Sequence, residues 1–340
     1  MPDQPKYFIH TPEELEGYTL VETEPEPPNP DKNREKRTNL KEIKDNITSL
    51  QDALNQRAKE FGLSAPKLDL PPLPPDFTKE HLEALNEIFG QGNLEATVCP
   101  TLEQLTDQYF QMMYPETQRD EDTARGLKSY QPDWWNKTAG AGFSITDEEA
   151  ERTNQTRATW VELYTKSMRT EANTLQNTIL LTETIQKPDY KNGTQHYGTK
   201  EGEDETKDKL LPIIRQIFGD TANRCNLTWD QINQELIPKL KEEVLKIFQS
   251  KKLKLTNIEI IITPAIVSNL QTTLKHPSDS QTNTSDWSST PLIDQYDKDS
   301  GRRLVVGTSV DGGAGSVRLG HRGVGWGRRG FRLSVALKNT

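Results

Sequence analysis

The clearest hydrophobic pattern in the chain lies between Leu40 and Phe61, where apolar residues recur at alternating intervals of three and four. This is the heptad repeat of a coiled coil, and Gly62 follows where a helix typically ends. The stripe is too narrow for an ordinary surface helix. The pattern predicts a coiled-coil helix over residues 38–62 that pairs with another chain or with a distant helix of this one. Ordinary packing within the chain is the alternative. The stripe consists of Leu40, Ile43, Ile47, Leu50, Leu54 and Phe61.

Proline-rich segments flank this predicted helix on both sides. Residues 24–30 hold four prolines, and proline removes an amide donor and restricts the residue before it to extended backbone. Residues 1–37 are therefore predicted to form an extended arm, which either docks on a neighbour or is an unstructured terminus. Five prolines within residues 66–75 predict a stiff spacer over residues 63–77. A ligand for an aromatic-lined groove is a second interpretation of this spacer.

Helix signals dominate residues 78–187. Thr78 and Thr101 each open a short predicted helix, and the capping box Thr146–Glu149 starts a longer one that continues to about Gln186. No proline or glycine interrupts that longer stretch, and forty helical residues would span about 60 Å. The sequence therefore predicts one long helix in this region.

Two adjacent tryptophans, Trp134 and Trp135, lie in an irregular stretch before the long predicted helix. Tryptophan is enriched at protein interfaces, where its large ring fills a pocket. We interpret the pair as an anchor on a partner. Burial within the same chain is an equally good interpretation.

Residues 207–275 hold the densest apolar pattern and are predicted to form the main folded domain. A capping box at Thr228–Gln231 opens a helix, and Pro238 interrupts its pattern. The spacing then changes to the alternation of a strand, up to Ile262, and Pro264 opens a further helix. The pattern predicts a helical domain with one strand.

Residues 276–340 read as a polar linker followed by a basic, glycine-rich β tail. The linker, residues 276–301, has no apolar periodicity, whereas three short apolar runs between residues 304 and 337 predict a β meander. So small a sheet is marginal alone and is expected to add to the sheet of a neighbour. The predicted fold is therefore mainly α and elongated, with a small C-terminal meander that makes it α+β.

Composition strengthens the expectation of partners. Hydrophobic residues make up 32% of the chain and charged residues 27%. A supply this thin is predicted not to offset the entropy of ordering around one core, so neighbouring chains are expected to complete the interior. Of the net charge of −9, the eight basic residues and one acidic residue of 301–340 contribute +7, which leaves −16 for the rest. This polarity suits contact with acidic neighbours or with nucleic acid.

No motif predicts a catalytic residue, a cofactor or a metal site. The five histidines are scattered, and Cys99 and Cys225 are too few for a disulfide framework or a metal site. Gly325–Gly330 has the spacing of a dinucleotide motif, but the chain ends ten residues later, without the required helix and acidic residue. Aspartates within residues 294–299 lack the spacing and the glutamate of a calcium loop. The sequence therefore predicts a protein that is not an enzyme.

No segment predicts contact with a membrane. The longest apolar runs are far shorter than the ~20 residues that span a bilayer, and the first ten residues are polar and contain proline. We therefore expect a soluble protein made in a reducing compartment such as the cytoplasm.

Arginines and aromatic residues cluster in the glycine-rich tail. Arginine binds phosphate and tryptophan stacks on bases, so the cluster suits RNA or single-stranded DNA. The arginines also alternate with apolar residues, as outward faces of strands do, which favours protein contact through an added strand. Both interpretations use the same residues: Arg318, Arg322, Trp326, Arg328, Arg329 and Phe331.

The order of these segments resembles that of structural proteins in tailed-bacteriophage virions, such as neck, tail and baseplate components. The likeness is carried by Glu24–Pro30, the Leu40–Phe61 heptads, Pro66–Pro75 and Gly301–Thr340. The resemblance implies a virion location, with assembly in the host cytoplasm. It also implies a homo-oligomer whose partners are the other subunits of a symmetric assembly, and it carries over no functional residue.

Overall fold

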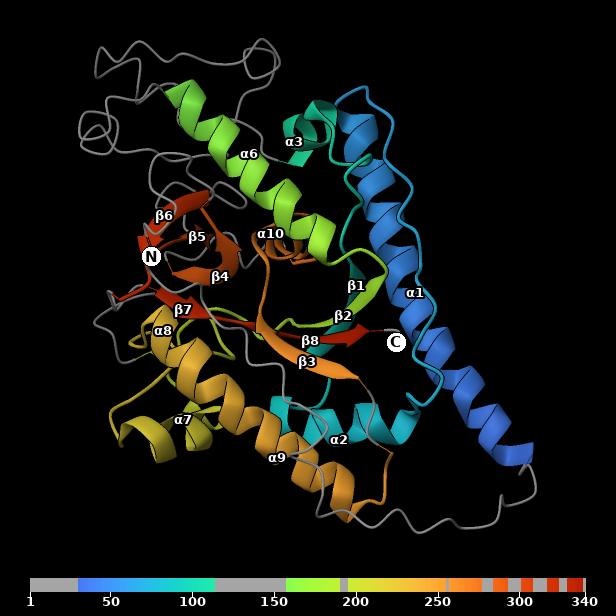
Figure 1. Ribbon diagram of the computed structural model, residues 1–340, viewed down its shortest axis with the longest axis vertical. Coiled ribbons are helices and arrows are strands. Elements are labelled where there is room, and N and C mark those ends of the chain that lie inside the picture. The colour runs from blue at the N-terminus through green and yellow to red at the C-terminus, as the bar shows by residue number, and fades with distance from the viewer. Residues whose placement is uncertain are drawn as a thin grey trace, which may run out of the picture.

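The computed structural model describes residues 30–113, 157–189, 195–254, 257–276, 284–292, 301–307, 317–323 and 329–338. Within these residues the fold is α+β, with two four-stranded sheets and helices packed around them (Figure 1). The α+β class is therefore confirmed. The prediction of a separate C-terminal meander is wrong, because the tail strands are divided between the two sheets.

The first sheet has the strand order β1-β2-β8-β3, and every neighbouring pair is antiparallel. Leu181 on β2 and Ile260 on β3 both lie opposite Val335, so the C-terminal strand β8 occupies the interior of the sheet. Its four strands come from parts of the chain far apart in sequence. They are β1 (Leu94–Val98), β2 (Thr178–Glu183), β3 (Ile258–Ile262) and β8 (Leu333–Lys338).

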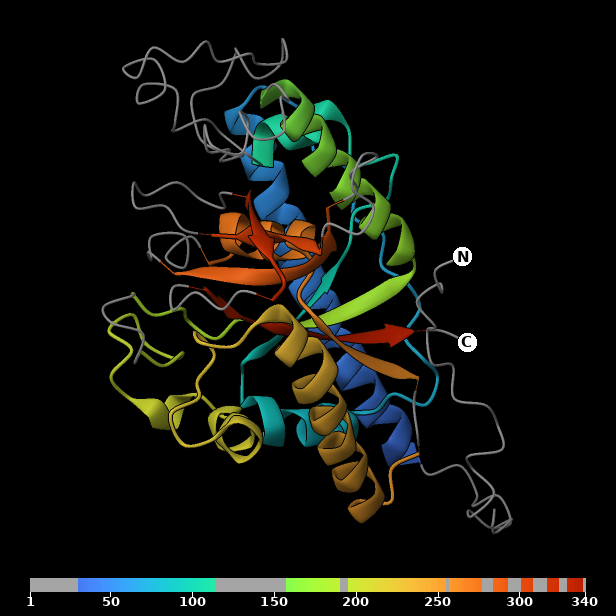
Figure 2. The same cartoon turned by 60° about the vertical axis from the view of Figure 1, so that its left-hand side comes forward.

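The second sheet has the order β6-β5-β4-β7, and β4 pairs with β7 in parallel. Only Arg332 separates β7 from β8, so one run of chain belongs to both sheets and joins them, as Figure 2 shows. We call this junction the β7–β8 crossover. The strands are β4 (Ser285–Pro291), β5 (Arg302–Val306), β6 (Val317–His321) and β7 (Arg329–Phe331).

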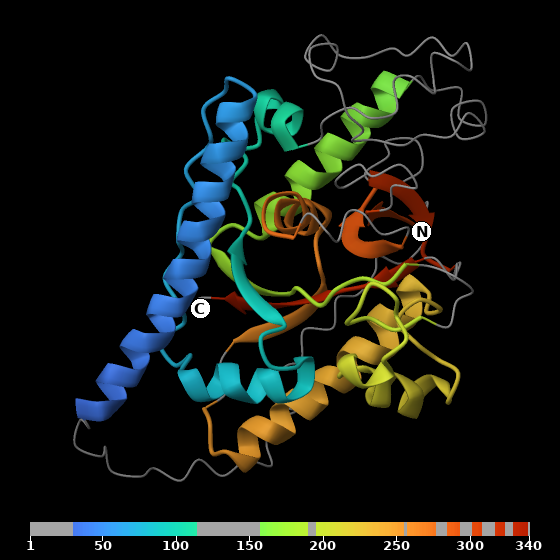
Figure 3. The same cartoon turned by 180° about the vertical axis from the view of Figure 1, so that it is seen from behind.

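Helices cover the sheets on several sides. The long helix α1 runs along the edge strand β1, whereas α2 packs against α9 and α9 packs against β3 (Figure 3). A π-helical turn, Ile232–Leu236, joins α8 to α9, close to the interruption predicted at Pro238. The helices are α1 (Pro30–Glu60), α2 (Lys79–Phe89), α3 (Asp107–Met113), α6 (Arg157–Thr174), α7 (Leu211–Phe218), α8 (Trp229–Gln231), α9 (Ile237–Ser250) and α10 (Ala265–Leu274), with a short 3-10 turn η3 (Glu205–Lys207).

Four residues of the heptad stripe of α1 are buried in the chain's own core. Ile43, Ile47, Leu50 and Leu54 are each at most 5% exposed, and α1 contacts β1, α2 and α10. The predicted helix is confirmed, although it begins at Pro30 and so includes the last part of the segment predicted to be an extended arm. The coiled coil is wrong, because the same spacing also suits a helix laid on the edge of a sheet. Phe61 is partly buried beneath the Arg57 guanidinium.

The proline-rich segment is not a free spacer. Residues 63–77, which we call the strap, return alongside α1 (Figure 1). The side-chain amide of Gln51 donates to Pro66 O at 3.0 Å and its oxygen accepts from Leu68 N at 2.6 Å. Leu68 and Pro74 are buried. One glutamine on α1 therefore pairs with the extended backbone as a neighbouring strand would.

The single long helix predicted up to residue 186 is wrong. Helix α6 ends at Thr174, and Asn177 adopts a left-handed backbone (φ 58°) just before β2 begins. Asparagine tolerates this conformation better than most residues, so it can end a helix without glycine. Every residue of β2 is buried. Residues 114–156, which include the predicted start of that helix, lie outside the described residues.

The predicted polar linker contains a buried strand, β4. Its polar side chains are satisfied internally: Ser288 Oγ donates to Leu304 O at 2.7 Å, and Thr290 Oγ1 accepts from Ala265 N at 2.9 Å. Trp287 is 1% exposed. The pattern failed here because serine and threonine look like loop residues when their partners are unknown. By contrast, the structure confirms the strand ending at Ile262 and the helix that follows Pro264.

Buried apolar residues from α1 to β8 form one continuous core. Among the residues that the structure describes, Leu102 is the one large hydrophobic side chain that is clearly exposed, at 41%. The prediction that other chains must complete the interior is therefore wrong for this part of the chain. The core closes because polar strands such as β4 take part in it, which composition alone does not show.

Candidate functional site

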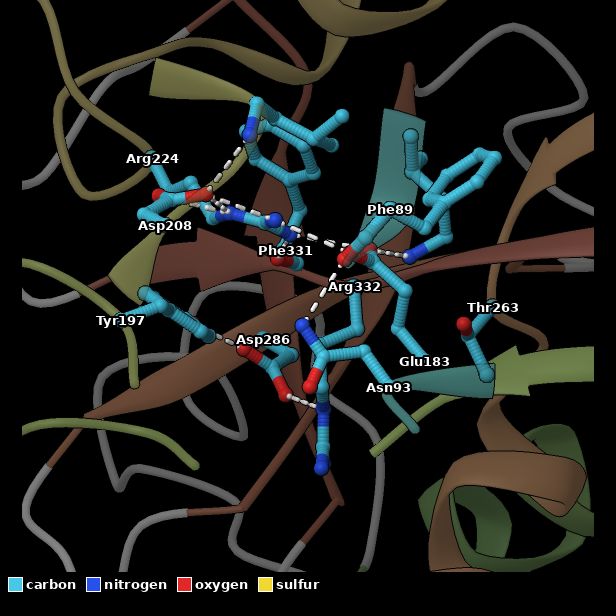
Figure 4. A network of polar contacts seen from close by, with 12 residues as sticks. Phe89, Asn93, Glu183, Tyr197, Asp208, Arg224, Thr263, Asp286, Phe331 and Arg332 are labelled. Carbon is cyan, nitrogen blue, oxygen red and sulfur yellow. Dashed lines mark hydrogen bonds and ion pairs between the residues drawn. The ribbon is translucent and has the colours of Figure 1, made fainter. Parts of the chain in front are cut away.

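The most concentrated polar chemistry in the described residues is a buried ion-pair network around Arg224. Its guanidinium donates to both oxygens of Glu183 and to both oxygens of Asp208, with closest distances of 2.9 Å (Figure 4). All three side chains are at most 1% exposed. The arginine is also flanked by the rings of Tyr197 and Phe331, 5.2 and 5.3 Å from its central carbon.

The two carboxylates of this network lie next to the ends of elements, and Arg224 lies in the turn between α7 and α8. Glu183 ends β2, and Asp208 accepts from Leu210 N at 3.1 Å just before α7. Glu183 also accepts from Leu333 N at 2.8 Å, while Arg224 donates to Phe331 O at 3.2 Å. The network therefore holds the backbone on both sides of the β7–β8 crossover.

A second buried pair lies at the crossover itself. Arg332 Nε donates to Asp286 Oδ2 at 2.9 Å, and the Tyr197 hydroxyl donates to the other oxygen of Asp286. A side chain at Gly330 would overlap the Tyr197 ring and hydroxyl, so this position requires glycine. Together the two pairs tie β2, β4, β7 and β8 to the loops around α7.

The ionisation of these groups fits a structural role. Burial by itself lowers the pKa of Arg224, but Asp208 and Glu183 outweigh it and hold that pKa well above its usual value. Burial, then Asp286, raises the pKa of Tyr197, and burial raises the pKa of the Cys225 thiol to about 12. Since the thiolate is the reactive form, Cys225 is not prepared for nucleophilic chemistry. The network is closed to solvent and mutually satisfied.

Glu171 on α6 is a third polar junction. Its carboxylate accepts from the hydroxyls of Ser289 and Thr290 on β4, and Thr290 in turn accepts from Ala265 N at the start of α10. Burial raises the pKa of Glu171 to about 7, although the two hydroxyls favour its ionised form. Glu171 therefore joins three elements and titrates near neutral pH.

The surface carries a different kind of feature, an open groove between α1 and the strap. It has a volume of about 580 Å³, and its lining is largely apolar. We call it the strap groove, lined mainly by Lys44, Leu70, Pro71, Pro72, Leu73 and Phe77. Pro72 is exposed and Leu70 and Leu73 are half-buried, so an approaching partner would meet apolar surface.

The residues predicted as a partner site do not come together in one place. The α1 stripe and Phe331 are core residues, and Phe331 is fully buried. Arg329 lies over the Trp287 ring, 5.0 Å from its centroid, whereas Arg322 is exposed beside Asp230, with a closest approach of 3.6 Å. Outside the described residues or side chains lie Leu40, Trp134, Trp135, Arg318, Trp326 and Arg328.

Several basic residues of the tail interact with aromatic rings or carboxylates of the same chain. Besides Arg322, Arg329 and Arg332, the Arg303 guanidinium lies over the Trp229 ring at 4.2 Å, and Lys338 pairs with Glu259. The division into an acidic body and a basic tail therefore helps to hold the C-terminal strands in place.

Sequence reasoning did not identify Glu183, Asp208 or Arg224. One signal was present, because Glu183 lies two residues after the apolar run Ile179–Leu181 and so places a charge at the end of a buried strand. A buried carboxylate requires a partner. Nothing in the spacing indicates that the partner is Arg224, forty-one residues later.

Two further findings concern the described residues only. No three or more histidine, cysteine, aspartate or glutamate side chains among them are grouped so as to hold a metal ion. None of their helices combines the length and the apolar character needed to cross a membrane.

Comparisons with known proteins found no similar protein. No protein family, no curated protein and no solved structure matches the chain.

Proposed function

We propose that this chain is a non-enzymatic structural component of a large multi-subunit assembly, of the kind found in the neck, tail or baseplate of phage virions. It binds neighbouring copies of itself or other subunits through its outer surface. The observation that carries this proposal is the strap groove, because it gathers open apolar surface, whereas nearly all other large hydrophobic side chains in the described residues are buried or half-buried.

The chemistry of the groove supports binding over catalysis. Its lining is proline, leucine and phenylalanine, with Lys44 as its one ionisable side chain. Catalytic pockets usually combine apolar walls with several convergent polar groups. The polar groups that this chain does gather, around Arg224, are closed to solvent and serve the fold.

Nucleic-acid binding through residues 301–340 is the alternative function. Its support is weakened by the contacts that the tail arginines make with Trp229, Asp286 and Trp287. Arginines engaged with the chain's own rings and carboxylates contribute less to phosphate binding, which depends on free positive charge.

The test is the oligomeric state of the full chain, measured by mass photometry and light scattering over a wide concentration range. We expect oligomers, and we expect Leu73→Asp and Pro72→Asp to dissociate them, because a charge in the groove opposes apolar contact. Leu102→Asp is the matched control, since Leu102 is exposed outside the groove. Circular dichroism verifies that each variant is folded.

A chain that stays monomeric at every concentration contradicts the proposal. So do oligomers that Leu73→Asp and Leu102→Asp weaken equally. Salt-dependent binding of single-stranded DNA, lost in Arg322→Ala, would instead favour the alternative function.

A further inference from the structure

The strap groove includes Lys44, which ends a stretch of α1 with excess positive charge. Residues 30–44 contain six basic and three acidic residues, and Lys44 is both exposed and part of the groove lining. An occupant of the groove is therefore favoured if it combines apolar side chains with negative charge.

The N-terminal arm of the same chain has this combination. Residues 1–29 hold seven acidic residues and one basic residue. Two small apolar clusters interrupt the acidic sequence, Tyr7–Ile9 and Tyr18–Val21, and acidic residues flank the second cluster on both sides. The charge of the arm is thus opposite to that of the helix that follows it.

The length of the arm also fits. Lys44 lies fourteen residues into α1 from Pro30, which is about 21 Å along the helix axis. The segment from Val21 to Pro30 is proline-rich, and its nine residue steps would reach about 28 Å in an extended conformation with 3.1 Å per residue. A tether that matches the distance between two sites gives a high effective concentration, of the order of millimolar.

We propose that the acidic arm folds back along α1 and fills the strap groove of its own chain, with Tyr18 and Leu20 on the apolar lining and the acidic residues near Lys44. The inference rests on the proposed function in one respect, because it makes the arm a built-in competitor for neighbouring subunits. The arm then covers the groove until a neighbour displaces it.

The experiment is energy transfer within the full chain. The variant Thr19→Cys with Pro72→Cys carries a donor and an acceptor dye, one in the arm and one in the groove. The native cysteines do not interfere, because Cys99 and Cys225 are buried and burial raises the pKa of both thiols. A second variant, Thr19→Cys with Gln216→Cys, places the acceptor on the exposed surface of α7 instead.

At concentrations where mass photometry shows a monomer, we expect strong transfer for the groove pair and weak transfer for the α7 pair. Leu20→Asp removes an apolar anchor and should lower the ratio of docked to undocked arm about 10-fold or more. Lys44→Glu reverses the charge at the groove and should lower that ratio about 5-fold. Lys241→Glu, an exposed lysine on α9, is the matched control and should leave it unchanged.

Equal transfer for the two acceptor positions overturns the proposal. Transfer that appears only as concentration rises also overturns it, because the arm then reaches the groove of another copy. Mass photometry of the same samples separates the two proposals. Strong transfer in a chain that stays monomeric would support the docked arm and contradict the assembly function. Oligomers without transfer would support the assembly function and contradict the docked arm.

Discussion

Two regions of this molecule distribute polar and apolar groups in opposite ways. At the β7–β8 crossover the ionised side chains of Arg224, Glu183 and Asp208 are sealed inside the fold. At the strap groove, Leu70 and Leu73 face an open surface. The first region holds several ionised groups but is closed to solvent. The second region has a largely apolar lining but is open to solvent. Under the proposed function, access to solvent, more than residue type, decides where this protein meets other molecules.

The comparison also predicts which property each region controls. Substitutions in the ion-pair network should change the free energy of unfolding, because a buried charge without its partner is costly. Substitutions at exposed groove positions should change association and leave unfolding nearly unaffected. The following predictions test this separation, from the largest expected effect to the smallest.

Arg224→Leu is expected to have the largest effect. The substitution leaves Glu183 and Asp208 buried without a counter-charge and should lower the free energy of unfolding by about 3–5 kcal/mol. Urea-induced unfolding of the full chain measures it. Arg322→Leu is the matched control, since Arg322 is 47% exposed and its pair with Asp230 is long, so it should cost less than about 1 kcal/mol. Equal losses in the two variants would contradict a network role for Arg224.

Gly330→Ala is expected to be the next in size. The added methyl overlaps the Tyr197 ring and hydroxyl, and overpacking of this kind costs about 1–3 kcal/mol. Tyr197→Leu should relieve the overlap. The double variant should therefore lose less unfolding free energy than the two single variants lose together. Purely additive losses in urea unfolding would show that the overlap at Gly330 involves another group.

The local pattern predicted elements well where packing partners did not matter. The heptad spacing placed α1, Pro264 placed the start of α10, and the apolar alternation placed β3. The same signals could not say what α1 packs against, because a narrow stripe fits a partner helix and a sheet edge equally. Within α1, Gln51 looks like any surface polar residue, yet it holds the strap.

The pattern failed where distant partners decide the structure. Strand β4 is rich in serine and threonine, and its burial depends on Leu304, Ala265 and Leu227, which accept or donate the hydrogen bonds of its side chains. The Arg224 network likewise joins residues from four separate parts of the chain. Long-range hydrogen bonds leave no period in a single sequence, so neither feature could be predicted.

Gln51→Ala tests the strap, which lines the groove and so belongs to the open one of the two compared regions. The substitution removes two hydrogen bonds to extended backbone and should cost about 1–2 kcal/mol. Hydrogen exchange should also become faster at the Leu68 amide, which donates to Gln51. Gln56→Ala, an exposed position on the same helix, is the control. Unchanged exchange at Leu68 would contradict the pairing of the strap with Gln51.

The smallest expected effect is the pH dependence contributed by Glu171. Burial raises its pKa in the folded chain to about 7, above the value of 4.5 for an unperturbed carboxyl group. Between pH 4.5 and 7 the folded state therefore binds more protons than the unfolded state at this site. The contribution of Glu171 to stability is accordingly full below about pH 4.5 and is lost as the pH rises through 7.

Glu171→Gln should remove this dependence, because the amide does not ionise and can still accept from Ser289 or Thr290. Relative to the unsubstituted chain, the variant should gain about 1 kcal/mol of unfolding free energy between pH 5 and pH 8, a value reduced because Glu171 is only half-buried. Comparing the two proteins at each pH cancels the titration of all other groups. A difference that stays constant over this range would mean that Glu171 is ionised throughout, with Ser289 and Thr290 outweighing its burial.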